Sequence, residues 1–432
     1  MPGFTNLLRT NRNYRYTWIG QVISEVGDNF NNIAVFALVM QQTHSGLVVS
    51  GVMLARAVAA ILAGPVAGVL LDRFDRRRAM ITSDLVRAVI ALCFVFTVNE
   101  KSPGLLYLLS ALLMFASPFF TSGRASILPV IATKEELHTA NSLTQTTQWT
   151  SVCIGSLLGG TSTGLFGYKA AFVFNALSFV FSALCISRLH PPKGLAFRAE
   201  RKDLNETRVA RPWHEYREGL RYMAATPLIL AVGLVGVGWA TGGGAAQILF
   251  SVFGEQVFHR GALGIGQIWG AAGFGLILGG LSANRWGSRL RFKQYKLTIV
   301  LCYIVHGGSY VLFSQSQSYA AALVFIGLSR ASVAVSSVLN MSQLLRHVAD
   351  EYRGRVFSTM ESMVWATMMV SMLLAGLGTT KMDPRTIGAI AGMLSSTTAL
   401  FWAWADSTGR LPEPALEGVD PADVEVHGEP NV

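Results

Sequence analysis

A short basic stretch between two long apolar segments constrains this chain more than any other feature. The apolar segments cover Ser45–Leu71 and Ala79–Phe96, and each can cross a bilayer, whose hydrocarbon core is spanned by about 20 residues of helix. At their junction, Gly68–Arg78 carries four arginines in its last six residues. These side chains cannot lie in hydrocarbon, and arginine-rich loops stay in the cytoplasm. We therefore expect two membrane-spanning helices joined by a cytoplasmic loop, Gly68–Arg78, called the hinge below.

The second half of the chain repeats this pattern. Gly280–Arg289 again lies between two apolar segments, and Gly68 aligns with Gly280 when the two stretches are superposed. Two further similar segments, Leu128–Trp149 and Leu344–Trp365, follow in the same order. Two repeats in one order indicate a duplication, and parallel six-span repeats are one known plan for transporters.

The composition agrees with a membrane protein. Of the 432 residues, 51% are hydrophobic and only 14% are charged, and the mean hydropathy is +0.42. Soluble globular domains carry about 25% charged residues, so this chain has too little charge to cover a surface that faces water. We therefore expect an integral membrane protein.

Apolar segments of spanning length recur along the chain and divide it into two halves. We predict an all-α integral membrane protein with twelve transmembrane helices in two pseudo-symmetric six-helix halves, residues 1–189 and 218–405. The polar, basic stretch 190–217 is the expected cytoplasmic linker, with a short surface helix, and 406–432 is an acidic tail expected to be disordered. The expected spans are Tyr16–Met40, Leu47–Leu71, Ala79–Val98, Leu105–Val130, Leu143–Phe166 and Ala170–Leu189, then Pro227–Phe253, Leu263–Trp286, Leu297–Phe313, Ala320–Leu345, Val356–Thr379 and Thr386–Trp404.

The formal charge of +10 comes from basic residues on alternate loops. With the N-terminus inside, the cytoplasmic loops hold the hinge arginines and the basic stretch Arg188–Arg221, whereas the opposite loops are nearly free of basic residues. This positive-inside bias sets topology and is not a footprint for nucleic acid. We expect a monomeric, multi-pass protein of the cell inner membrane, surrounded by lipid, with both termini in the cytoplasm and no nucleic-acid partner.

Sequence patterns of enzymes and metal sites are missing. There is no phosphate-binding glycine loop with lysine, no histidine cluster with metal-ligand spacing and no serine in a nucleophile elbow. Cys93, Cys153, Cys185 and Cys302 lie in apolar segments and form no Cys-x-x-Cys pair. We therefore expect no enzyme activity, no metal and no cofactor.

The hinge resembles the loop between spans 2 and 3 of the major facilitator superfamily, Gly-x-x-x-Asp-Arg-x-Gly-Arg-Arg. Asp75 stands where most members carry glycine, and this variant is similar to the branch that contains enterobactin exporters and macrolide efflux pumps. The resemblance implies alternating access between two halves and export driven by a proton gradient, but no particular substrate. Other motifs of the branch follow in order: Ser24–Asp28, Asp84–Ala88, Arg124 between Pro118 and Pro129, Ala140–Leu143, Asn175–Phe179, Glu218–Leu220 and Gly354–Ser358.

Span 1 carries polar residues at three- and four-residue spacing, which places them on one helix face. Carboxyls within a membrane helix are costly and by default face a cavity. We predict that Asp28 takes up and releases the coupled proton with Glu25 as its partner, and that Asn29 and Asn32 face the substrate. The alternative is that one or both carboxyls pair with an arginine as a structural bridge.

Arginines in the next three spans are the candidate partners of these carboxyls: Arg56, Arg87 and Arg124. Asp84 and Arg87 lie three residues apart near the hinge, and we expect them to pair within a hinge network. Arg124 lies deeper, and either contacts an anionic substrate or pairs with a span 1 carboxylate.

The hinge is predicted to act as a latch between the halves. Asp72 can accept hydrogen bonds from backbone N–H groups near Gly354–Phe357, where the dipole of span 11 is positive. Such contacts form only when the cytoplasmic side is shut, so they favour one of two states. The alternative is a simple topology anchor. The predicted latch comprises Gly68, Asp72, Arg73, Arg76, Arg77, Asp84, Arg87, Asp350, Glu351, Gly354 and Arg355.

Further polar and aromatic residues within the spans complete the expected substrate cavity. We assign Arg330, Glu361, Trp149 and Trp239 to it, with Trp269 and Trp365 as further candidates, although Glu361 alternatively belongs to the latch. A tryptophan in a span is more often a packing residue or an interface anchor. His306 is expected to be structural.

The sequence therefore predicts a secondary transporter that exports an amphipathic small molecule, such as a drug, an antibiotic or a siderophore, in exchange for protons. A lipid or lysophospholipid flippase of the same superfamily is the first alternative, and it predicts a side opening to the bilayer and no need for protons. A membrane receptor or scaffold that transports nothing is the second, and it predicts that neutralising Asp28 has no effect.

Overall fold

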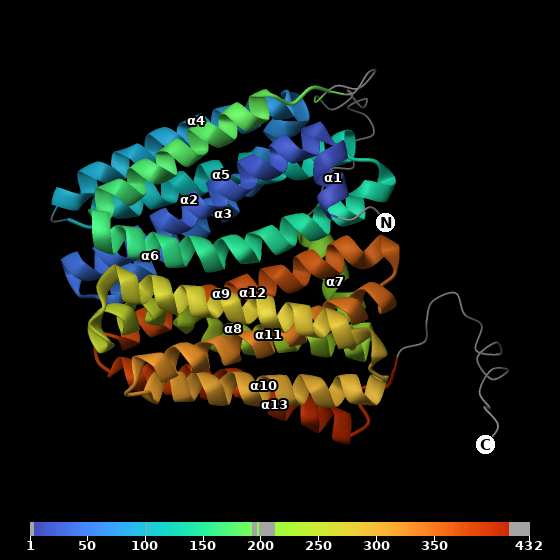
Figure 1. Ribbon diagram of the computed structural model, residues 1–432. Helices are drawn as coiled ribbons and strands as arrows, with labels where there is room; N and C mark the ends of the chain where they lie inside the picture. Colours follow the sequence, from blue (N-terminus) through green and yellow to red (C-terminus); the bar gives the residue numbers. More distant parts are fainter. Residues whose placement is uncertain (1–3, 101, 192–196, 198–211, 414–432) are drawn as a thin grey trace.

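The computed structural model describes residues 4–100, 102–191, 197 and 212–413, and nearly all of them are helical. Figure 1 shows two helical bundles side by side, one built from the first half of the chain and one from the second. The first contains α1 (Phe4–Thr10), α2 (Arg12–Thr43), α3 (Gly46–Arg73), α4 (Arg76–Cys93), η1 (Phe94–Asn99), α5 (Gly104–Ile131) and α6 (Lys134–Ser187). The second contains α7 (Pro212–Ala225), α8 (Pro227–Val252), η2 (Phe253–Val257), α9 (Gly261–Trp286), η3 (Gly287–Arg289), α10 (Phe292–Gln315), α11 (Tyr319–His347), α12 (Asp350–Gly378) and α13 (Pro384–Ser407).

Ten helices in the described part of the chain are long and apolar enough to cross a membrane, which agrees with the all-α membrane fold. One of them, in α6, bends at Gly167, whose φ of 79° lies outside the helical region, and the expected spans 5 and 6 fall on either side of this bend. The expected span 1 lies in the 32-residue α2, which is too polar to be counted among the ten. The total of twelve stays a prediction.

The hinge lies where α3 meets α4, and only Phe74 and Asp75 of it are outside the two helices, so the loop is shorter than expected. Helix α3 ends at Arg73 and α4 begins at Arg76. The carboxylate of Asp75 accepts a hydrogen bond from the backbone N–H of Arg78 at 2.9 Å. The first N–H groups of a helix have no partner within it, so aspartate at this position caps α4, where the family pattern has glycine.

The two bundles pack against each other along α6 and α9. Gly160 and Gly266 bring the two backbones together, because a Cβ built on Gly266 would stand 2.7 Å from the Cα of Gly160. A second contact joins α3 to α12, where Ser50 Oγ donates a hydrogen bond to the carbonyl oxygen of Met372 at 2.9 Å. We call the end of the molecule that holds His44 and Ser50 the far end. The far end is closed, because the two bundles contact each other there.

At the opposite end, which holds the hinge, α3 and α12 stand apart. A Cβ built on Gly68 or on Gly354 would meet no atom within 4 Å. Phe74 is 59% exposed, and Asp72 and Arg73 are exposed as well. The structure is therefore closed at the far end and open at the hinge end.

Helix α7 begins within the predicted linker, residues 190–217, and continues to Ala225, and it lies against the hinge end of α12. Glu218 Oε2 stands 3.1 Å from Arg355 Nη1, and the rings of Tyr222 and Tyr352 stack with their centroids 4.5 Å apart. The described chain that follows the first bundle is thus attached to the second.

Parts of two predicted segments lie outside the described residues, namely 192–196 and 198–211 of the linker and 414–432 of the tail. The described start of the tail packs on α10. Lys296 Nζ stands 2.5 Å from the carboxylate of Asp406 and donates a hydrogen bond to the carbonyl oxygen of Leu411 at 3.2 Å.

Candidate functional site

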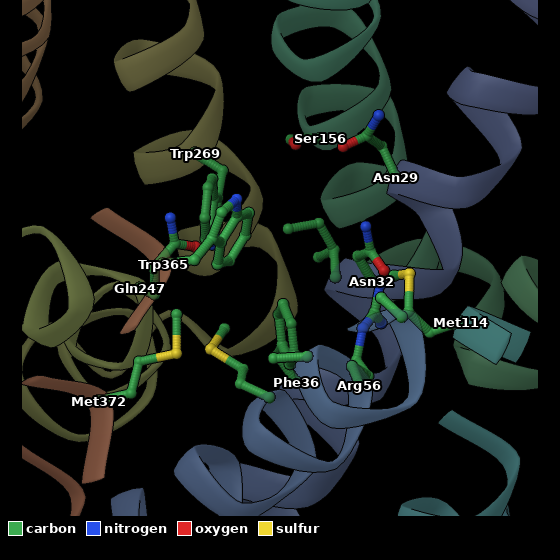
Figure 2. A pocket seen from close by; sticks show the side chains of 14 residues that line it. Asn29, Asn32, Phe36, Arg56, Met114, Ser156, Gln247, Trp269, Trp365 and Met372 are labelled. Carbon is green, nitrogen blue, oxygen red and sulfur yellow. The ribbon is translucent and has the colours of Figure 1, made fainter. Parts of the chain in front are cut away.

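A cavity with a volume of about 390 Å³ lies between the two bundles. This volume is in the range of sites that enclose a drug-sized ligand, about 300–1,000 Å³. The first bundle contributes polar side chains, Asn29 and Asn32 from α2 and Arg56 from α3. The second contributes Trp269 from α9 and Trp365 from α12. In Figure 2 the two indole rings lie on one side of the cavity, and the asparagines and Arg56 lie on the other.

Several polar atoms of the cavity wall are buried and have no hydrogen-bond partner within the described structure: Arg56 Nη1, Asn32 Oδ1 and Trp269 Nε1. The guanidinium of Arg56 stands 5.9 Å from the centroid of the Phe36 ring and forms no ion pair with a described residue. Buried polar groups are nearly always hydrogen-bonded, so these atoms are available to a ligand.

Glu25, on the same helix as the two asparagines, is paired. Its Oε1 accepts a hydrogen bond from Gln21 Nε2 at 2.8 Å and stands 3.4 Å from Arg124 Nη1. Asn29 Nδ2 donates to the backbone carbonyl of Glu25 at 2.8 Å. Of the two alternatives for Arg124, the structure thus shows pairing with a span 1 carboxylate.

Asp28 lies one residue from Asn29 and faces α4. Its Oδ2 stands 3.8 Å from Arg87 Nη1, and Arg87 also forms an ion pair with Asp84 on its own helix. The side chain of Asp28 is 33% exposed, whereas those of Arg87 and Asp84 are 3% and 0% exposed. Asp28 is therefore the more accessible of the two carboxyls that face Arg87.

Aromatic rings hold Arg87 in place. Its guanidinium carbon stands 4.8 Å from the ring centroid of Phe120 and 4.3 Å from that of Phe179, which are distances typical of cation–π contacts. Arg87 thus contacts Asp84 and these rings, and it reaches Asp28 on α2.

Among the described side chains, the latch residues of the first bundle form no ion pair with those of α12 in this open state. Arg76 Nη1 donates to the carbonyl oxygen of Ser126 at 3.1 Å, and Arg77 donates to the carbonyl oxygens of Ile186 and Ser187, so both arginines bind within the first bundle. Glu351 is exposed, and the side chain of Asp350 lies outside the described part. Arg355 pairs with Glu218 of α7, as described above. The latch stays a prediction for the state that is closed at the hinge end.

The remaining residues predicted for the cavity do not line it. Arg330 is buried in the second bundle, with its guanidinium 5.3 Å from the ring centroid of Phe250, and Glu361 is exposed. Trp149 packs against Gly280 at the α6–α9 contact, and Trp239 packs beside Gly243.

His306 is buried, and its Nδ1 lies 2.7 Å from Ser329 Oγ, which fits the structural role expected for it. Sequence reasoning missed Phe36, Gln247 and Met372, which also line the cavity. Gln247 could have been predicted, because it is a lone amide in an otherwise apolar segment. Phe36 and Met372 could not, since such residues are usual in any membrane helix.

Comparison with known proteins agrees with this architecture. The family model of the Major Facilitator Superfamily matches residues 17–366. A candidate bacilysin exporter, BacE of Bacillus amyloliquefaciens, is 23% identical over 84% of this chain and 88% of its own length. Macrolide efflux protein A of Streptococcus pyogenes is 22% identical over 83% and 87% of the two chains. The enterobactin exporter EntS of Shigella boydii serotype 4 is 25% identical over 86% and 87%.

A solved structure has the same fold. A bacterial homologue of the iron transporter ferroportin, in an inward-facing state, superposes with a TM-score of 0.66 over 91% of this chain and 98% of its own, at 15% identity. At this identity the likeness concerns the fold alone. The family match covers most of the chain, and its members are transporters rather than enzymes. This chain belongs to the Major Facilitator Superfamily.

Proposed function

We propose that this protein exports an amphipathic small molecule from the cell in exchange for protons. The observation that carries the proposal is the position of Asp28, a partly exposed carboxyl beside the cavity residue Asn29 and 3.8 Å from Arg87. A carboxyl at this place can gain and lose a proton while a substrate occupies the neighbouring cavity. The gradient then supplies the energy, and no cofactor is needed.

Arg87 supplies a physical link between the proton and the shape of the first bundle. When Asp28 is ionised, Arg87 is held between Asp28 on α2 and Asp84 on α4. When Asp28 is protonated, the attraction across the two helices weakens and Arg87 remains with Asp84. Protonation therefore changes how strongly α2 and α4 are joined, and a ligand or proton that favours one arrangement shifts the population of states.

Alternating access requires the two ends of the molecule to open in turn. The far end is closed and the hinge end is open, and the basic loops at the hinge end are expected to face the cytoplasm. We infer that this state loads substrate from the cytoplasm. In the opposite state Asp72 would bind the start of α12, and the far end would open. The similar proteins named above are exporters or efflux proteins, which supports transport out of the cell.

The experiment is substrate-induced proton movement in proteoliposomes. Purified wild type and Asp28→Asn are challenged with a dye, a catecholate siderophore, a macrolide and lysophosphatidylcholine, while an enclosed dye reports internal pH. Glu100→Gln, an exposed carboxyl outside the cavity, is the matched control. We expect at least one compound to move protons through wild type and the control but not through Asp28→Asn.

Three results would contradict the proposal. If a compound crosses without a proton signal in either protein, the chain is a uniporter, or a flippase when that compound is the lysolipid. If protons move equally through wild type and Asp28→Asn, Asp28 is not the coupling group. Failure of every compound to cross wild type would favour the receptor or scaffold alternative.

A further inference from the structure

The cavity wall holds buried polar atoms without hydrogen-bond partners in the described structure. Their positions indicate which kind of ligand could bind there. Arg56 Nη1 and Trp269 Nε1 are buried donors without an acceptor among the described residues, and Asn32 Oδ1 is a buried acceptor without a donor. They come from both bundles, α2 and α3 on one side and α9 on the other (Figure 2). A ligand that satisfies them needs at least two acceptor atoms and one hydroxyl or N–H donor.

The net charge of the surroundings limits the charge of that ligand. Among the described residues that line the cavity, Arg56 alone is charged. Its charge is matched by Asp28, which interacts electrostatically with Arg56 and with Arg87. An anionic ligand would therefore compete with Asp28 for Arg56, and a cationic ligand would face Arg56 without a counter-ion, whereas a neutral ligand with polar edges incurs neither cost.

The flat aromatic side chains of the cavity wall determine which ligand shape fits. Trp269 and Trp365 lie together on the second-bundle side of the cavity, and Phe36 lies across from them (Figure 2). Trp269 is fixed by an edge-on contact with Phe250, with ring centroids 5.1 Å apart. Such rings favour a planar partner that stacks on them. Met372 fills part of the same wall, and its flexible side chain adapts to different ring sizes.

We propose that the cavity selects uncharged, planar ring systems that carry carbonyl and hydroxyl oxygens along one edge. The ring stacks on Trp365, its oxygens accept from Arg56 and from the indole N–H of Trp269, and a hydroxyl donates to Asn32. This inference rests on the proposed transport of small molecules through the same cavity and names the class of molecule. Arg56 is its specificity-determining residue.

The test is equilibrium binding to purified protein in detergent, by calorimetry at one pH and without any gradient. The probes share a three-ring skeleton: 1,8-dihydroxyanthraquinone is neutral and carries a hydroxyl, a carbonyl and a second hydroxyl along one edge, anthraquinone-2-sulfonate is anionic, and proflavine is cationic. We expect the neutral probe to bind at least tenfold more tightly than either charged probe. Tighter or equal binding of a charged probe would overturn the proposal.

Three variants locate the contacts. Arg56→Met keeps an unbranched apolar stem and removes the donors, and we expect it to weaken binding of the neutral probe about tenfold or more. Trp269→Phe keeps an aromatic ring and removes the N–H, and we expect a smaller loss. Trp149→Phe, at the α6–α9 contact and outside the cavity wall, is the matched control and should bind as wild type does. The proposal is wrong if wild type and Arg56→Met bind the neutral probe with equal affinity while thermal unfolding shows that both proteins are folded.

These outcomes are separable from those of the proposed function. Binding is measured without protons moving, so a protein that binds the neutral probe selectively but moves no protons keeps this inference and loses proton coupling. A protein that couples protons to a charged compound, with Arg56→Met unaffected, keeps the proposed function and loses this inference.

Discussion

Each acidic side chain in the spans of the first bundle lies close to an arginine. Glu25 stands 3.4 Å from Arg124, Asp28 stands 3.8 Å from Arg87, and Asp84 pairs with Arg87. The sequence identified all five of these residues, because charges stand out in apolar helices. It left open which arginine each carboxyl meets, because that depends on how α2, α4 and α5 pack.

The pair of Glu25 and Arg124 should contribute to stability as a unit. Removing one partner leaves a charge in a largely buried place, since the two side chains are only 22% and 18% exposed. We expect Glu25→Gln and Arg124→Gln each to lower the thermal unfolding midpoint, and the double variant to lose less than the sum. A double-mutant cycle should give a coupling of about 1 kcal/mol or more. Additive losses would show that the pair is not energetically coupled.

Asp75 gives a prediction at the start of α4. Loss of an N-cap costs about 1 kcal/mol, whereas asparagine caps as well as aspartate. Asp75→Ala should therefore lower the unfolding midpoint, and Asp75→Asn should leave it nearly unchanged. An equal loss in both variants would show that the charge of Asp75, rather than its hydrogen bond to Arg78, stabilises the hinge.

At the scale of elements, the α6–α9 contact depends on glycine. A Cβ on Gly266 would stand 2.5 Å from the carbonyl oxygen of Ser156 and 2.7 Å from the Cα of Gly160, both of them backbone atoms that cannot move independently. Overpacking of this kind costs about 1–3 kcal/mol. Gly266→Ala should therefore reduce both stability and transport.

The matched control for this contact is Gly308→Ala. Gly308 is exposed on α10, and a Cβ there would meet nothing within 4 Å. Thermal unfolding and transport assays on both variants test the prediction. Wild-type behaviour of Gly266→Ala would mean that the two helices separate at little cost.

Most helices could be predicted from hydropathy, because long apolar runs leave few alternatives. The exceptions have physical causes. Helix α2 is interrupted by polar residues, so its apolar character is weak, and Gly167 bends one long helix where two separate spans were expected. The sequence placed the hinge between two spans but overestimated the length of the loop, and it did not reveal that Asp75 caps α4.

At the scale of the whole molecule, the two ends should open in turn. Gly46→Cys with Thr379→Cys places a cysteine pair at the closed far end, where a Cβ on Gly46 would stand 3.1 Å from the Cβ of Thr379. Asp72→Cys with Gly354→Cys places a pair at the open hinge end. We expect the far-end pair alone to cross-link in the resting protein, and a transported compound to increase cross-linking at the hinge end. Simultaneous cross-linking of both pairs in one molecule would contradict alternating access.

The residues that line the cavity were only partly predictable, because the cavity forms between the two bundles. Asn29 and Asn32 were expected, and they line it, because amides on one face of a membrane helix have few other roles. Its other wall combines residues far apart in sequence, such as Gln247 and Met372. Which of many similar side chains face inward is decided by the contact between the bundles, and a single sequence does not contain that contact.

The central claim is that Asp28 couples protons to transport, and counterflow tests it most directly. Proteoliposomes are preloaded with a compound that wild type transports, and exchange of labelled compound is compared with uptake driven by a pH gradient. We predict that Asp28→Asn retains exchange and loses gradient-driven transport, because substrate still binds and crosses while the proton step is missing. Retention of both would show that the proton is coupled elsewhere, and loss of both would show that Asp28 serves binding or folding.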